Sequence, residues 1–124
     1  MVEKQKTQLK SLKHIQMKKL LFFLFITLST TLFAQKPALV KIQTNAQCGD
    51  CKDRIETALH QTKGVVYAEL NMETKVVEVK YKVSKTDVAT LQKVLNLAGY
   101  DADDQKADPT AQKALPLCCQ PGGH

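Results

Sequence analysis

Residues 45–55 read Asn45-Ala46-Gln47-Cys48-Gly49-Asp50-Cys51-Lys52-Asp53-Arg54-Ile55, with two cysteines separated by two residues. An apolar run at residues 38–42 precedes this stretch, and a helical pattern begins near Asp50. The first sulfur is therefore expected on a loop and the second in or just before the first helical turn, where both can face one ion. Because the unpaired amides and the dipole at a helix N-terminus favour anions, this position favours thiolates, which bind metals and attack disulfides. The pair predicts a functional site rather than a structural cross-link.

Hydrophobic periodicity on both sides of the cysteine pair predicts alternating strands and helices. Residues 38–44 are rich in branched apolar side chains and predict a first strand. After the cysteines, Ile55, Ala58 and Leu59 recur at helical spacing, and Gly64 is expected to end that helix.

The next segments predict a hairpin followed by a second helix. Residues 65–70 and 75–81 form two strands that the turn at residues 71–74 joins. Residues 84–87 resemble a capping box and open a second helix, which Gly99 ends.

A short, polar fourth strand is expected at roughly residues 102–106, where Asp101, Asp103 and Asp104 would suit an exposed sheet edge. The order is then strand, helix, strand, strand, helix, strand. Two such units pack as an open-faced sandwich. The predicted fold class is α+β, a ferredoxin-like βαββαβ fold with a four-stranded antiparallel sheet and two helices on one face.

Residues 1–34 are expected to be a leader. Within it, Met17-Lys18-Lys19, the apolar stretch at residues 20–28 and Ala34 before Gln35 are typical of a secretory signal peptide at residues 17–34, cleaved after Ala34. A start at Met17 would make residues 1–16 a mis-called extension. The apolar stretch is shorter than the about 20 residues of a transmembrane helix, although an uncleaved membrane anchor is the alternative. We therefore expect export to a periplasm or to the outside of the cell.

The charge of the chain depends on this leader. The whole sequence has 18 Lys and Arg against 12 Asp and Glu, but residues 1–34 hold six of the lysines and one glutamate. The remaining 12 basic and 11 acidic residues nearly cancel. A nucleic-acid partner is therefore not expected, and residues 35–107 are predicted to form one small domain.

The four cysteines occur as the pair Cys48 and Cys51 and as the adjacent pair Cys118 and Cys119. Disulfides between or within the pairs remain an alternative, but two clusters of paired thiols favour ligands or redox groups. The second pair lies in residues 108–124, which are expected to be a flexible tail. Its ten residues before Cys118 span about 33 Å when extended, enough to return to the first pair. We hypothesise that the tail adds one or two thiolates to the site, in the same molecule or in a partner molecule.

Residues 38–107 resemble a heavy-metal-associated domain, the module of copper chaperones, of metal-transporting ATPase N-terminal domains and of exported mercury-binding proteins. The matching pieces are Cys48-Gly49-Asp50-Cys51, residues 64–71, residues 74–79 and Ala98-Gly99-Tyr100-Asp101. The resemblance implies that Cys48 and Cys51 are the metal-binding thiols and that Tyr100 lies beside the metal loop. Where the family usually has a methionine that fills the core beneath this loop, the chain has Ala46.

Thiolate ligands suit soft ions, so monovalent copper is the first expectation, with mercury or zinc as alternatives. The predicted function is non-enzymatic: an exported protein that holds a soft ion and passes it by thiolate exchange to a membrane metal transporter or another carrier. A metal-bridged homodimer is a further expectation. Two alternatives remain, namely a thiol-disulfide redox protein that uses the same cysteines and a metal-sensing interaction module.

Overall fold

The computed structural model describes residues 13–23 and 35–123 of the chain. The chain divides into two units, residues 1–34 and residues 35–124, which are described separately. In the first unit, residues 13–23 are helical and exposed. Across both described ranges, no helix combines the length and apolar character needed to cross a membrane. Much of the predicted signal peptide, including its cleavage site, lies outside the described residues.

The second unit contains an antiparallel sheet of three strands among the described residues: β1 (Ala38–Gln43), β2 (Val65–Asn71) and β3 (Val76–Tyr81). Strand β3 lies in the middle and pairs with both neighbours, in the order β1-β3-β2. Alternate side chains of β3, at Val77, Val79 and Tyr81, are buried. One face of the sheet therefore forms a wall of the core, as the alternating pattern predicts.

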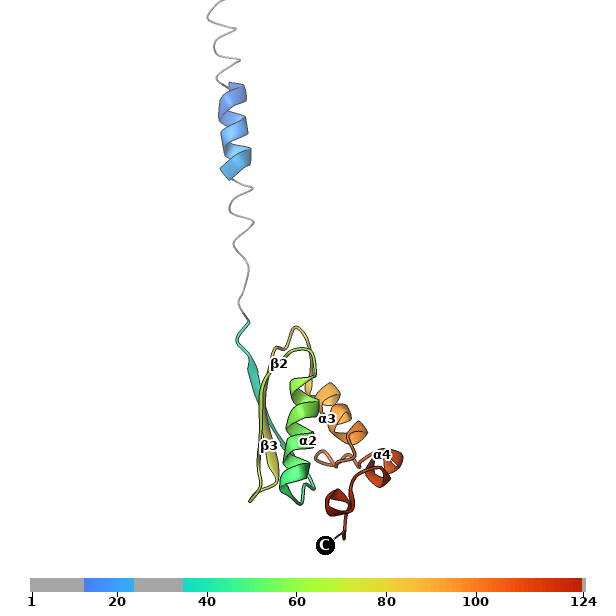
Figure 1. Cartoon of the computed structure of the whole chain (residues 1–124). Coiled ribbons are helices and arrows are strands. Elements are labelled where there is room, and N and C mark those ends of the chain that lie inside the picture. Colours follow the sequence, from blue (N-terminus) through green and yellow to red (C-terminus); the bar gives the residue numbers. More distant parts are fainter. Residues whose placement is uncertain (1–12, 24–34, 124) are drawn as a thin grey trace, which may run out of the picture. The chain divides into compact units, whose positions relative to one another are not determined.

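Two helices, α2 (Gly49–His60) and α3 (Val88–Leu97), cover that face of the sheet (Figure 1). Helix α2 buries side chains at intervals of four residues, as expected for one face of a helix. The core between the two layers includes these completely buried residues: Ile42, Cys51, Ile55, Leu59, Leu70, Val77, Val79, Leu91, Leu95 and Tyr100. The α+β arrangement of an antiparallel sheet and two helices on one face is confirmed.

Helix α3 begins one residue after the predicted capping sequence. Its N-cap is Asp87, whose Oδ1 accepts a hydrogen bond from the Thr90 amide at 2.7 Å. Residues 82–86 instead form turns, in which the amides of Lys85 and Thr86 donate to the Lys82 carbonyl. An aspartate therefore caps the helix directly, as its short acceptor side chain favours.

The predicted fourth strand is wrong. Residues 102–106 form a tight turn closed by a single bridge between Ala102 and Gln105, with Asp103 in the left-handed region at φ 51°. The Asp103 amide donates to the Gln43 carbonyl and its Oδ1 accepts from the Gln43 amide, both at 2.9 Å, at the end of β1. Its Oδ2 accepts from the Gln92 side chain of α3, also at 2.9 Å. Aspartate side chains compete for backbone donors and tolerate left-handed conformations, so this acidic segment forms a turn instead of an edge strand.

Residues 108–123, which were expected to be a flexible tail, contain two short helical elements. They form the short helix α4 (Pro109–Lys113) and the 3-10 turn η1 (Leu117–Cys119). Asp108 caps α4 through a 2.9 Å bond from the Ala111 amide, and the proline at the first helical position suits a helix start. Because Leu115 and Cys119 are buried in the domain core, packing fixes a segment whose sequence lacks strong periodicity.

Candidate metal centre

The two cysteines of the first pair lie where β1 leads into α2. Cys48 is the N-cap of α2, with extended backbone angles, and its side chain caps no amide among the described residues. Cys51 lies in the first turn and is completely buried. The two sulfurs are 3.3 Å apart, and both residues are free thiols. The loop and helix positions predicted for this pair therefore place two sulfurs side by side.

The loop before Cys48 is held by hydrogen bonds, although alanine stands at position 46. The amide and the hydroxyl of Thr44 both donate to the Lys75 carbonyl, at 2.9 and 2.8 Å. The Asn45 side-chain carbonyl accepts from the Asp101 amide at 2.9 Å, which ties the loop to the segment after α3. Ala46 itself is completely buried. Sequence reasoning missed the part played by Asn45, because its partner is distant in the chain.

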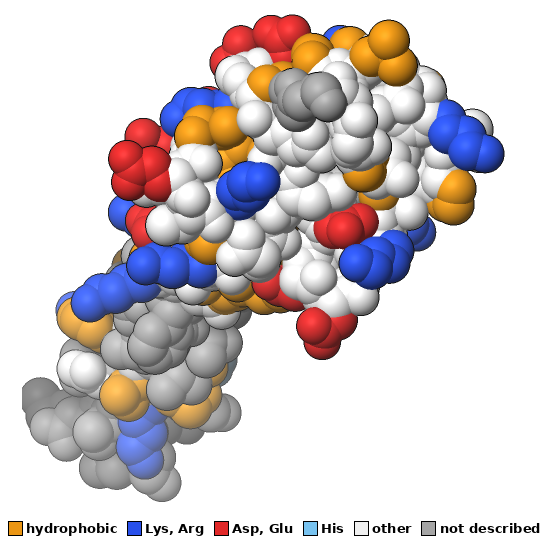
Figure 2. Space-filling view, turned by 90° about the horizontal axis from the view of Figure 1, so that it is seen from below, with side chains coloured by type: hydrophobic (Ala, Val, Ile, Leu, Met, Phe, Trp, Pro, Cys, Tyr) orange, Lys and Arg blue, Asp and Glu red, His pale blue; other side chains and the backbone are white. Residues whose placement is uncertain are grey.

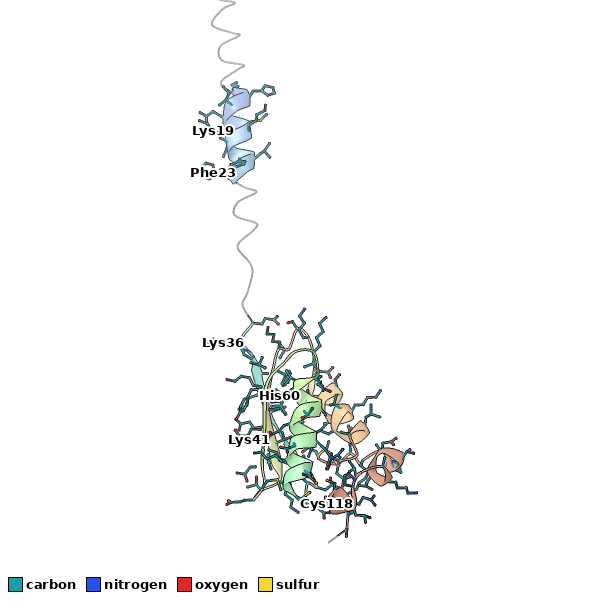
Figure 3. All side chains as sticks on the ribbon, in the orientation of Figure 1. Lys19, Phe23, Lys36, Lys41, His60 and Cys118 are labelled. Atoms are coloured by element: carbon teal, nitrogen blue, oxygen red, sulfur yellow. The ribbon has the colours of Figure 1, made fainter. Side chains whose placement is uncertain are left out.

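The C-terminal segment brings the second pair to the same place. The Cys119 sulfur is 3.6 Å from the Cys48 sulfur and 3.9 Å from that of Cys118. The sulfurs of Cys48, Cys118 and Cys119 all lie within 4.8 Å of one another. In Figure 3, Cys118 lies near the start of α2, whereas His60 lies toward the opposite end of that helix. All four cysteines proposed as ligands therefore gather at one end of the domain.

Burial divides these thiols into an inner and an outer set. Cys51 and Cys119 are buried, whereas Cys48 and Cys118 are half-buried. The Cys118 thiol also lies 3.8 Å from a carboxylate oxygen of Asp50, the second residue of α2. An approaching thiol would therefore meet the outer pair first.

Tyr100, which the resemblance placed beside the metal loop, lies next to the thiols of Cys51 and Cys119. Its side chain is completely buried, and its hydroxyl has no conventional hydrogen-bond partner among the described residues. Burial, together with the nearby thiols of Cys51 and Cys119, raises the pKa of Tyr100 far above its ordinary value. The hydroxyl therefore stays protonated and can donate a hydrogen bond toward a sulfur.

The surroundings change the acidity of three of the thiols. Burial opposes ionisation of Cys51, but the Gln47 amide and the neighbouring thiols outweigh it and lower the pKa of Cys51 to about 7. The Cys51 amide favours the Cys48 thiolate, yet the Cys51 thiol and partial burial raise the pKa of Cys48 overall. Burial and the Cys51 thiol raise the pKa of Cys119 to about 12. One inner thiol therefore ionises most readily, as a metal ligand at neutral pH requires.

The chemistry of the donors fits a soft ion. Three of the four free thiols have sulfurs within 4.8 Å of one another, the sulfur of the fourth, Cys51, lies 3.3 Å from that of Cys48, and a buried hydroxyl lies next to two of the four. Thiolates prefer monovalent copper, zinc and iron–sulfur clusters over hard cations such as magnesium or calcium. The residues present can therefore bind a soft metal ion through two, three or four sulfurs.

Comparison with known proteins agrees with this geometry. The family model described as "Heavy-metal-associated domain" matches residues 44–101, which include Cys48, Cys51 and Tyr100 but neither tail cysteine. The copper chaperone CopZ of Staphylococcus aureus (strain bovine RF122 / ET3-1) is 41% identical over 54 residues, which cover 44% of this chain and 79% of CopZ. A copper-exporting P-type ATPase of Staphylococcus saprophyticus is 39% identical over 72 residues, 56% of this chain but only 9% of the ATPase.

Solved structures show the same relationship. A CopZ metallochaperone superimposes with a TM-score of 0.51 at 32% identity, covering 52% of this chain and 98% of the chaperone. Oxidized MerP from Ralstonia metallidurans CH34 superimposes with a TM-score of 0.52 at 25% identity, covering 54% of this chain and 94% of MerP. With the cysteine pair, the buried tyrosine and the antiparallel sheet all in place, the chain belongs to the heavy-metal-associated domain family.

Proposed function

We propose that this protein is an exported, non-enzymatic carrier of soft metal ions, with Cu(I) as its cargo. The observation that carries the proposal is the pair of free thiols of Cys48 and Cys51, whose sulfurs lie 3.3 Å apart at the start of α2. The relatives named as copper chaperones and copper-exporting ATPases support copper as the ion. Mercury and zinc are the other ions that a sulfur site of this kind accepts.

The two thiols differ in how much proton release metal binding requires. With a pKa of about 7, Cys51 is partly a thiolate at neutral pH. Cys48 loses its proton as its sulfur–metal bond forms, since metal binding drives the deprotonation of ligands. The helix dipole at the start of α2 stabilises the negative charge on both sulfurs.

Release proceeds by ligand exchange. An incoming thiolate from a membrane metal transporter or another carrier bonds to the ion, one resident thiolate then leaves, and that thiolate takes up a proton. Neither the ion nor the sulfurs change oxidation state. Half-buried Cys48 is the accessible member of the first pair, so the exchange begins at this sulfur.

Export is part of the proposal because of the leader. Its support is the basic Met17-Lys18-Lys19 start, the apolar stretch that follows and the small residue Ala34. The second structural unit begins at Gln35, the residue after the proposed cut. Expression in a secreting cell, followed by fractionation and N-terminal sequencing, tests the cleavage. A mature protein that begins at Gln35 supports export, whereas an intact chain in the membrane fraction indicates the anchored form.

The redox alternative is less well supported by the acidity and burial of the thiols. A redox nucleophile needs a thiol that is both ionised and accessible. Here the half-buried Cys48 has a raised pKa, and the thiol with a lowered pKa, Cys51, is completely buried. A disulfide reductase assay on the metal-free protein separates the two functions.

The decisive experiment is non-denaturing mass spectrometry of the reduced protein titrated with Cu(I), Zn(II) and Hg(II). The matched variant is Cys48→Ser with Cys51→Ser. Tight binding of one Cu(I) that the double variant loses supports the proposal. An absence of specific uptake of any ion, together with a readily cycling disulfide, would replace it with the redox function.

A further inference from the structure

We propose that Cys118 and Cys119 bind the same ion as Cys48 and Cys51, so that one chain completes its own sulfur site. This inference rests on the proposed function and specifies its coordination. The family match ends at residue 101, and the C-terminal segment therefore adds these two thiols outside the matched domain.

The sulfur separations suit a shared ion. A tetrahedral site with metal–sulfur bonds of about 2.3 Å places its sulfurs about 3.8 Å apart. The separations from the Cys119 sulfur are 3.6 Å to Cys48 and 3.9 Å to Cys118. Because three sulfurs also lie within 4.8 Å of one another, small side-chain rotations suffice to direct them at one centre. The geometry therefore brings three sulfurs close enough to share one ion without a change of fold, and the Cys51 sulfur lies 3.3 Å from one of them, that of Cys48.

The tail holds its cysteines in place by contacts that do not involve a metal. Leu115 is buried in the domain core just before η1. The Gln120 side-chain amide follows η1 and donates to the carbonyls of Lys113 and Leu115, at 3.1 and 2.8 Å. These contacts brace the turn on both sides of the cysteines. Much of the conformational entropy of this segment is therefore lost already on folding, and metal binding need not order it again. Such a preorganised site favours metal binding.

The Tyr100 hydroxyl is an independent sign that the buried side of this cluster receives charge. A completely buried hydroxyl without a conventional partner is costly, so its position requires a reason. It lies next to the thiols of Cys51 and Cys119, one from each pair. Once a bound ion converts these thiols to thiolates, the hydroxyl can donate to a charged sulfur. The two inner cysteines and Tyr100 thus form the closed side of the site.

The outer cysteines form the open side. Cys48 and Cys118 are half-buried. Figure 2 views the molecule from the side on which Figure 3 labels Cys118. In that view, acidic and basic side chains are interspersed around scattered apolar ones. The Cys118 sulfur lies within 4.8 Å of the Cys48 sulfur and can fill the coordination position that a second chain would otherwise have to supply. We therefore expect the loaded protein to be a monomer, in place of the metal-bridged homodimer considered from the sequence.

The test compares Cys118→Ser, Cys119→Ser and Cys48→Ser/Cys51→Ser with the unchanged protein. Leu117→Ser is the matched control, because Leu117 belongs to the same turn and is 74% exposed. X-ray absorption counts the sulfurs around bound Cu(I) and Hg(II), and competition with a Cu(I) chelator gives the affinity. Non-denaturing mass spectrometry gives the number of chains per ion.

We expect more than two sulfurs around the ion in a monomer, and one fewer in each tail variant. Loss of a residue that hydrogen-bonds to a metal ligand typically weakens metal binding about 10–100-fold. Loss of a ligand itself should weaken binding by at least this factor. Leu117→Ser should bind as the unchanged protein does. Because Cys119 is buried and its replacement can disturb folding, the half-buried Cys118 provides the cleaner comparison.

The possible failures are distinguishable. Two sulfurs around the ion in the unchanged protein, with the same affinity in Cys118→Ser, would overturn this inference and leave the proposed function standing. Loss of metal binding in Cys48→Ser/Cys51→Ser would agree with both the proposed function and this inference. Absence of uptake by the unchanged protein would overturn the proposed function itself.

Discussion

The sulfur of Cys119 lies 3.6 Å from that of Cys48, although 71 positions separate the two residues in the chain. The segment that carries Cys119 is held by its own helix cap, by buried Leu115 and by the Gln120 side chain. The environment of the metal-binding loop consequently depends on residues beyond the matched domain. Changes that displace this segment should alter stability and thiol reactivity together.

Replacing Gly99 by alanine should destabilise the domain and loosen its C-terminal segment. Gly99 has a φ of +100°, and an added Cβ would lie 2.8 Å from Leu115 Cδ1 and 3.1 Å from the Ala111 carbonyl oxygen. The left-handed conformation alone costs an alanine roughly 1–2 kcal/mol, so the free energy of unfolding should fall by at least that much. Denaturant titration measures the loss, and alkylation of Cys119 should become faster.

Gly49→Ala is the control for this prediction. Gly49 opens α2, and a Cβ there would meet no described atom within 4 Å. Alanine should be tolerated or should stabilise the helix by up to about 1 kcal/mol. Equal stability of the two alanine variants would show that Leu115 does not pack against Gly99 in solution.

Removing the cap of α4 should selectively open the C-terminal segment. Asp108→Ala loses the 2.9 Å bond from the Ala111 amide, and loss of an N-cap typically costs about 1 kcal/mol. Hydrogen–deuterium exchange should become faster at residues 109–119 and stay unchanged in α3. Asp108→Asn retains a capping oxygen and should exchange like the unchanged protein. Faster exchange of similar size in both variants would contradict a capping role.

Tyr100→Phe should stabilise the metal-free protein. The variant removes a buried hydroxyl that lacks a conventional partner, and leaving such a group unsatisfied costs about 1–3 kcal/mol. Thermal unfolding should show a higher midpoint without metal. The gain should shrink or reverse with bound ion, because the hydroxyl can then donate to a thiolate. Tyr81→Phe is the control, since the Tyr81 hydroxyl is not among the buried, unpaired atoms of the described residues.

Asp87 should make stability depend on acid pH. Hydrogen bonds from Thr90 hold the pKa of Asp87 below its ordinary value of 3.8. A carboxyl group whose pKa is lower in the folded chain contributes stability above its unfolded pKa and loses that contribution as pH falls through its folded pKa. Asp87→Asn still caps α3 but cannot titrate. The stability of the unchanged protein relative to this variant should therefore fall as the solution is acidified below the ordinary pKa.

Denaturant unfolding of both proteins from neutral to acid pH measures this difference. Asp104→Asn serves as the control, because Asp104 is exposed and makes no side-chain hydrogen bond within the described structure. The prediction would be contradicted if the difference in free energy of unfolding between the unchanged protein and Asp87→Asn stayed constant at every pH.

Local patterns were sufficient for most of the fold. The alternation of buried side chains in β3 and the four-residue spacing of Ile55 and Leu59 in α2 reflect the geometry of single elements, so both patterns can be read from the sequence. The spacing of Cys48 and Cys51 likewise places both sulfurs at one helix start. The predicted fourth strand is absent because Asp103 lies in a turn and its side chain accepts from the Gln43 amide at the end of β1, a competition for backbone donors that composition alone does not resolve.

The sequence by itself was enough to predict two layers, the order of the first five elements and a thiol pair at the start of α2. For the C-terminal segment, the sequence predicted only that its length allows Cys118 and Cys119 to approach the loop that carries Cys48. The position of Cys119 beside Cys48 came from tertiary contacts, above all the packing of Leu115 against Gly99. The physical reason is that short segments such as residues 108–119 have no strong conformational preference, and buried contacts with distant residues select one arrangement.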